Sequence, residues 1–109
     1  MNTTAKWYLQ ELERTAAHTT QMSQEVVHLF REPARQDDHT SAIQMARRNR
    51  PFIEDYIRHC NDYQASALSL VQSFLQESTP TADEAKQALG LLANVVAAAT
   101  DAREPFTCL

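Results

Sequence analysis

Acidic and histidine side chains at helical spacing are the first candidates for chemistry in this sequence. Asp55, His59 and Asp62 follow one another at steps of four and three, which places them on one face of a helix. Nitrogen and oxygen ligands of this kind hold metal ions. Metal sites in helical bundles usually repeat a Glu-x-x-His motif on several helices, and this sequence has no such repeat. We expect an ordinary polar face, with a helical carrier of a metal or small ligand as an alternative.

A short basic cluster raises the possibility of phosphate binding. Arg47, Arg48 and Arg50 lie within one turn of a predicted helix, and such a patch suits a nucleic-acid backbone. The formal net charge of −4 opposes bulk attraction to nucleic acid. Arg50 is also spaced to pair with Glu54 one turn on. A nucleic-acid-binding regulatory module that uses these arginines is therefore an alternative, and nucleic acid is not the expected partner.

The nucleophiles of the chain have no activating neighbours in the sequence. Cys60 falls in the apolar stripe of a predicted helix and Cys108 in the C-terminal tail, and the two form neither a metal-ligand motif nor a disulfide framework. There is no glycine-rich loop for a nucleotide. We therefore expect no enzymatic activity and no cofactor. The cysteine pattern and the lack of a secretory signal predict a cytoplasmic location.

The composition indicates an all-α protein with one domain spanning residues 1–109. Only one glycine is present, whereas β-architectures use glycine in tight turns. Hydrophobic residues make up 43% of the chain, enough for a folded core, and the length suits a single core. No stretch is long and apolar enough to suggest a membrane span. The sequence predicts an antiparallel bundle of three helices.

Apolar periodicity places the helices at about residues 3–30, 41–77 and 81–102, followed by a flexible tail at 103–109. Ser41 with Gln44 and Thr81 with Glu84 have the spacing of capping boxes at two of these starts. Pro51 interrupts the second helix. The apolar phase continues across this proline, so we expect a kink near residue 50, and a break with Asn49 capping a new helix is the alternative.

A ridge beside the apolar stripe of the first helix has the composition of a binding surface. Tryptophan, tyrosine and arginine are enriched at interface hot spots. This predicts partner binding by a set of residues along the first helix: Trp7, Tyr8, Glu11, Arg14 and His18. The competing interpretation is that Trp7 only covers the end of the bundle.

The third helix is apolar on nearly all sides. Its run from Gln87 to Thr100 is uncharged, and two amphipathic partners within the chain cover only part of such a surface. Twofold dimers are the commonest oligomers. We therefore expect a homodimer that forms a larger helical bundle, with an interface made of Leu89, Gly90, Ala93, Val96 and Ala97.

Together these patterns predict a non-enzymatic helical interaction module. Surplus apolar surface without a catalytic constellation is typical of proteins that bind another protein. We expect this one to regulate, sequester or escort its partner, as an anti-activator, an inhibitor or a chaperone does.

Overall fold

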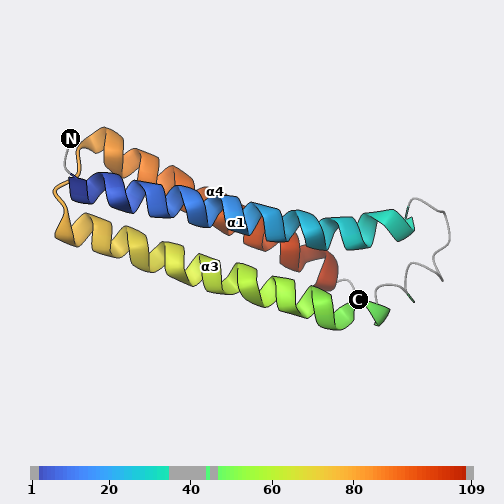
Figure 1. The fold of residues 1–109 in the computed structure, drawn as a ribbon. Helices are drawn as coiled ribbons and strands as arrows, with labels where there is room; N and C mark the ends of the chain where they lie inside the picture. The colour runs from blue at the N-terminus through green and yellow to red at the C-terminus, as the bar shows by residue number, and fades with distance from the viewer. Residues whose placement is uncertain (1–2, 35–43, 45–46, 108–109) are drawn as a thin grey trace.

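The computed structural model describes residues 3–34, 44 and 47–107 of the chain. These residues form the helices α1 (Thr3–Ala34), α3 (Arg50–Glu77) and α4 (Ala82–Thr107) and contain no strand. Each helix packs against the other two, and α3 runs antiparallel to α1 and α4 (Figure 1). The predicted all-α bundle of three helices is confirmed. None of these helices combines the length and the hydropathy needed to cross a membrane.

Two helices extend beyond their predicted ends. α1 continues past residue 30 to Ala34, and α4 continues past residue 102 to Thr107. Pro33 and Pro105 were expected to stop them, yet each lies in the last turn. Each proline removes only its own backbone N–H, which would bond to the carbonyl four residues earlier, and only one or two helical residues follow it. The prediction of a flexible tail is therefore wrong for residues 103–107, which are helical, while 108–109 lie outside the described residues.

The interruption expected before Pro51 is a helix boundary. Asn49 lies in a turn with φ −89° and ψ 1°, and α3 begins at Arg50 with Pro51 in its first positions. This corresponds to the break that the sequence left as an alternative, in place of the expected kink. Proline is favourable there because its missing N–H would have no helical partner. The side chain of Asn49 makes no capping hydrogen bond. The predicted Ser41–Gln44 capping box falls partly outside the described residues.

The start of α4 is fixed by a reciprocal pair of hydrogen bonds. The backbone N–H of Glu84 donates to Thr81 Oγ1 at 3.1 Å, and the backbone N–H of Thr81 donates to Glu84 Oε1 at 2.9 Å. This confirms the predicted capping box. α3 ends close by, where Ser78 donates from its hydroxyl to the carbonyl oxygen of Phe74 at 2.6 Å. Residues 78–81 therefore form a short connection with hydrogen bonds on both sides.

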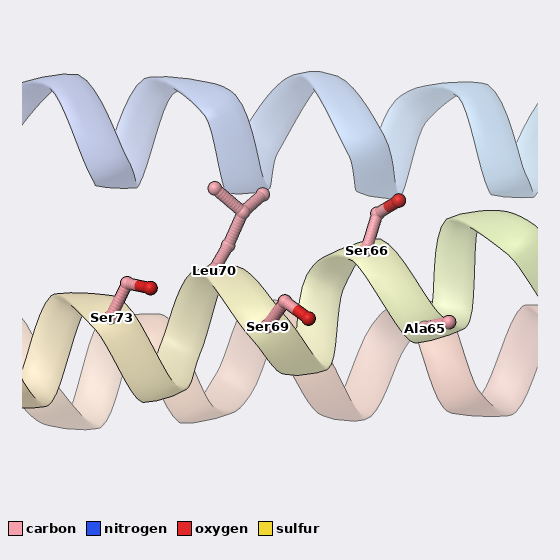
Figure 2. Close-up of a pocket in the computed structure, with 5 residues that line it drawn as sticks. All are labelled: Ala65, Ser66, Ser69, Leu70 and Ser73. Atoms are coloured by element: carbon pink, nitrogen blue, oxygen red, sulfur yellow. The ribbon is translucent and has the colours of Figure 1, made fainter.

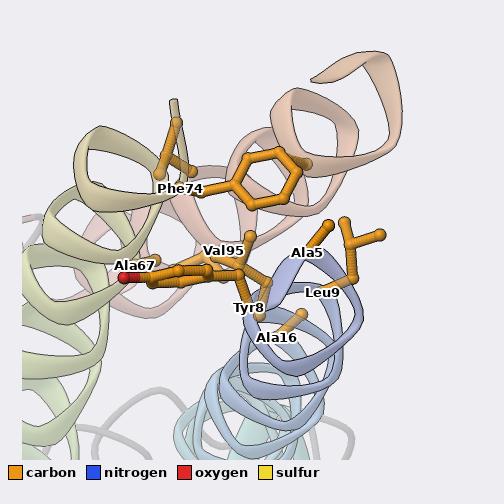
Figure 3. Close-up of a cluster of buried hydrophobic side chains, with 10 residues drawn as sticks. Ala5, Tyr8, Leu9, Ala16, Ala67, Phe74 and Val95 are labelled. Carbon is orange, nitrogen blue, oxygen red and sulfur yellow. The ribbon is translucent and has the colours of Figure 1, made fainter. Parts of the chain in front are cut away.

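The core consists of two hydrophobic clusters along the bundle. One surrounds Tyr8 and Phe74, whose rings meet edge to face with centroids 5.8 Å apart (Figure 3). The other contains Val26, Ile53 and Cys60. The fully buried side chains that α4 supplies to the two clusters are small, namely Ala88, Val95, Ala99 and Ala102. Small residues allow close helix packing, so the larger side chains of α1 and α3 fill the interior.

Candidate protein-interaction surfaces

The ridge predicted on α1 is present, with one exception. Trp7 is 52% exposed, Arg14 is exposed, and Glu11 and His18 are half-buried. We call these four residues the Trp7 ridge. Tyr8, which was predicted with them, is buried in the core. Its side chain points into the core, so it contributes to the ridge only by supporting the ring of Trp7.

Tyr8 anchors one end of the ridge to α3. Its hydroxyl donates a hydrogen bond to the carboxylate of Glu77. This hydrogen bond, together with burial, raises the pKa of the Tyr8 hydroxyl above its ordinary value. The ring of Trp7 packs edge to face on that of Tyr8, with centroids 5.0 Å apart. The half-exposed indole therefore rests on a side chain that is itself fixed to a second helix.

Ring contacts anchor the other end of the ridge. The ring of His18 lies against that of Tyr63 on α3, with centroids 5.8 Å apart. His59 approaches the same tyrosine at 6.5 Å, and its Nδ1 lies 2.8 Å from the carbonyl oxygen of Asp55. The Trp7 ridge is thus attached to α3 at both ends.

A shallow groove lies on α3 between these two attachments. It has a volume of about 420 Å³, and the side chains that line it are mostly small: Ala65, Ser66, Ser69, Leu70 and Ser73. Leu70 and Ser66 point toward α1 (Figure 2). Because α1 and α3 are antiparallel, Glu11 and Arg14, which fall between Tyr8 and His18 in α1, lie opposite the part of α3 that contains this groove. We call this feature the serine groove.

The serine groove was not predicted from the sequence. Serines on a helix face are usually solvated, and only their position on α3 beside the Trp7 ridge distinguishes these serines from an ordinary polar surface. A signal was present in the spacing of Ser66, Ser69 and Ser73, since steps of three and four place small side chains in one line.

The residues predicted for the dimer interface all lie on the surface of α4. Leu89 is 52% exposed and Val96 is 39% exposed, while Gly90, Ala93 and Ala97 are exposed. A Cβ atom added at Gly90 would meet no atom within 4 Å. The bundle therefore leaves this side of α4 uncovered, as the sequence indicated.

Two further apolar side chains, both on α3, are exposed and were not among the predicted residues. Leu68 and Leu75 on α3 are 50% and 48% exposed. They were outside the predicted apolar stripe of their helix, which contains the buried Ala67, Val71 and Phe74. Sequence periodicity identified the inward face of α3 but gave no reason to connect these leucines with α4.

The candidate metal ligands are engaged in local contacts on α3. Asp55 accepts a hydrogen bond from Arg58 at 2.6 Å and lies 3.7 Å from His59 Nδ1. Asp62 is exposed. Across the part of the chain that the structure describes, no group of three or more histidine, cysteine or acidic residues is arranged to hold a metal ion.

The basic cluster presents two exposed arginines and one in an ion pair. Arg47 and Arg48 are exposed, and Arg50 Nε lies 2.9 Å from Glu54 Oε1, as the spacing predicted. The acidic partner reduces the positive charge that a phosphate backbone would meet.

Cys60 is fully buried beneath α1 and α4. Its Sγ lies 3.9 Å from the carbonyl oxygen of Thr19, which is also buried. Burial raises the pKa of the Cys60 thiol, and the nearby positive charge of Arg103 opposes this in part. A buried thiol with a raised pKa is a poor nucleophile, which fits a packing role.

Comparison with known proteins provides no family assignment. The chain matches no family model, and no curated protein or solved structure was found to be similar to it. A functional proposal therefore rests on the surfaces described above.

Proposed function

We propose that this protein is a non-enzymatic, cytoplasmic interaction module that binds a partner protein and regulates, sequesters or escorts it. The observation that supports this most is the placement of Trp7. A tryptophan that is 52% exposed and is supported by a buried ring has the features of an interface anchor.

The partner site consists of the Trp7 ridge and the serine groove. Trp7 supplies apolar area at one end, while Glu11 and Arg14 supply opposite charges along the side. The small groove residues permit close approach of a partner backbone. Self-association is a second part of the proposal, because the uncovered side of α4 is a separate surface.

The alternative functions receive less support. The nucleic-acid alternative relies on three arginines, of which Arg50 pairs with Glu54, in a chain of net charge −4. The carrier alternative relies on Asp55, which already contacts Arg58 and His59.

Affinity capture with matched variants tests the partner site. Tagged protein is compared with a variant carrying Trp7→Ala and Arg14→Ala, and captured proteins are quantified by mass spectrometry. We expect the double variant to lose specific partners while its thermal midpoint stays nearly unchanged, since both side chains are exposed.

Phe52→Ala is the control, because Phe52 is 64% exposed on α3 and lies outside the ridge and groove. It should retain the same partners. Equal recovery by the wild type, the double variant and the control would contradict the proposed site. A salt-sensitive recovery of nucleic acid that requires Arg47 and Arg48 would replace the proposal by the nucleic-acid alternative.

A further inference from the structure

Glu77 differs from the other acidic residues of α3 in the partner that it holds. Glu54 and Asp55 accept hydrogen bonds from arginines of their own helix. Glu77 accepts its hydrogen bond from the hydroxyl of Tyr8, which lies on α1 and 69 positions earlier in the chain. Its side chain is exposed, whereas Tyr8 is buried. A carboxylate on the surface of one helix therefore holds a side chain in the core from another.

Tyr8 connects this carboxylate to the exposed indole of Trp7. The ring of Tyr8 meets the ring of Trp7 edge to face with centroids 5.0 Å apart, and it meets the ring of Phe74 edge to face at 5.8 Å. Its hydroxyl points from α1 toward α3 (Figure 3). Phe74 thus supports the Tyr8 ring from within the core, and Glu77 holds the tip of the same side chain.

The Tyr8 hydroxyl also adjoins the serine groove. The pKa of Tyr8 is raised first by its hydrogen bond to Glu77, and the hydroxyl of Ser73 opposes this increase in part. Ser73 lies one turn before Glu77 on α3 and lines the groove. The Tyr8 hydroxyl is therefore the point at which the support of Trp7 meets the groove.

We infer that Glu77 is a positioning residue for Trp7, because it holds the tip of the ring on which the indole rests. An exposed aromatic side chain that is already fixed loses less conformational entropy when a partner binds, so its affinity for that partner is higher. The consequence for binding rests on the function proposed above. The positioning itself is a property of the free protein and is measurable without a partner.

The fluorescence of Trp7 tests the positioning directly. Trp7 is the only tryptophan in the sequence, so emission excited at wavelengths that tyrosine does not absorb comes from this residue alone. Glu77→Ala removes the hydrogen-bond acceptor, and Tyr8→Phe removes the donor but retains the ring. Loss of this bond should raise the undocked population of the Tyr8 ring about fivefold. We expect each variant to show lower Trp7 anisotropy and stronger quenching by acrylamide than the wild type.

A double variant shows whether Glu77 acts through Tyr8. If it does, Glu77→Ala should change the Trp7 signal in the wild type and should change it no further in a Tyr8→Phe background. All variants are measured below their thermal transitions, so that the signal reports the folded chain. A general loss of stability would not abolish the effect of Glu77→Ala in one background only.

Two control variants separate the hydrogen bond from other effects of the carboxylate. Glu77→Gln loses the negative charge but keeps an oxygen that accepts the Tyr8 proton, so its Trp7 signal should stay close to that of the wild type. Asp62→Ala removes an exposed carboxylate elsewhere on α3 and should leave the signal unchanged.

Two results would overturn the inference. One is a Trp7 signal that Glu77→Ala leaves unchanged, and the other is an effect of Glu77→Ala that persists in full when Tyr8 is phenylalanine. Affinity capture distinguishes this failure from failure of the proposed function. Tyr8→Phe alters no exposed side chain, so a reduced recovery of the partners that require Trp7 would extend the positioning to binding. Coupled fluorescence together with capture that is independent of Trp7 and Arg14 would retain the positioning and reject the partner site.

Discussion

The hydroxyl of Tyr8 donates a hydrogen bond to the carboxylate of Glu77 and so ties the beginning of α1 to the end of α3. Tyr8 is buried and Glu77 is exposed, so the bond closes the end of the core at its boundary with solvent. The partner site begins beside this bond, since Trp7 packs on the ring of Tyr8.

This bond predicts a loss of stability in alkaline solution. The pKa of Tyr8 is raised, first by the hydrogen bond to Glu77 and then by burial, so the folded chain holds this proton more tightly than the unfolded chain. The contribution to stability is complete below about pH 10, the usual tyrosine pKa, and is lost as the pH rises through the folded value. Tyr8→Phe should be less stable at neutral pH and should show a weaker decline above about pH 10. Urea unfolding midpoints of the wild type and of Tyr8→Phe, measured across this pH range, test the prediction. An equal decline of stability in both proteins would contradict it.

Two phenylalanines on α3 should respond very differently to the same substitution. Phe74 is fully buried and Phe52 is 64% exposed. Phe74→Ala should cost about 3–5 kcal/mol of unfolding free energy, since it leaves a cavity in the core. Phe52→Ala should change it by less than about 0.5 kcal/mol. Urea unfolding followed by circular dichroism measures both, and similar losses would show that the core is misassigned.

Removal of the capping hydroxyl should weaken α4 specifically. Thr81→Ala leaves the N–H of Glu84 without its partner and should cost about 1 kcal/mol. Thr81→Ser retains the hydroxyl and should recover most of the loss. Thermal unfolding of the two variants checks this, and an equal loss in both would mean that the methyl group rather than the hydroxyl matters.

Cys60 should react with thiol reagents only when the bundle opens. Its Sγ is buried and its pKa is raised by burial, so little thiolate is exposed in the folded chain. In a Cys108→Ser background, labelling by a disulfide reagent at pH 8 should be slow and should accelerate in parallel with unfolding by urea. Rapid labelling without denaturant would indicate a local opening of α3.

The sequence was most informative where one periodicity decides the structure. The inward residues of α1 and α3 repeat at steps of three and four, and the Thr81–Glu84 spacing has a single structural interpretation. These features gave the bundle and the start of α4. Helix ends were harder to predict, because α1 and α4 continue one or two residues past Pro33 and Pro105, although each proline removes a backbone hydrogen bond there.

The surfaces depended on contacts that one helix cannot reveal. Exposed Leu68 lies outside the apolar stripe of α3, and only the hydrogen bond between Arg103 and Asn61 shows that this side of α3 borders α4. Tyr8 and Trp7 are adjacent in sequence, yet Tyr8 is buried and Trp7 is exposed. Which of the two faces the core depends on how α1 is turned about its own axis relative to α3. The α4 surface was easier to predict, because a helix without charges around its middle has more apolar area than its own chain covers.

The short connection at residues 78–81 has a consequence for the order of folding. Closing a short loop costs less entropy than joining α1 to either later helix, so we expect the α3–α4 hairpin to form first and α1 to dock last. Phe74 and Val95 would then form an early folding nucleus, and Tyr8 would complete this cluster when α1 docks. The Trp7 ridge would assemble in the final step, which makes recognition of a partner by this ridge a signature of the fully folded chain.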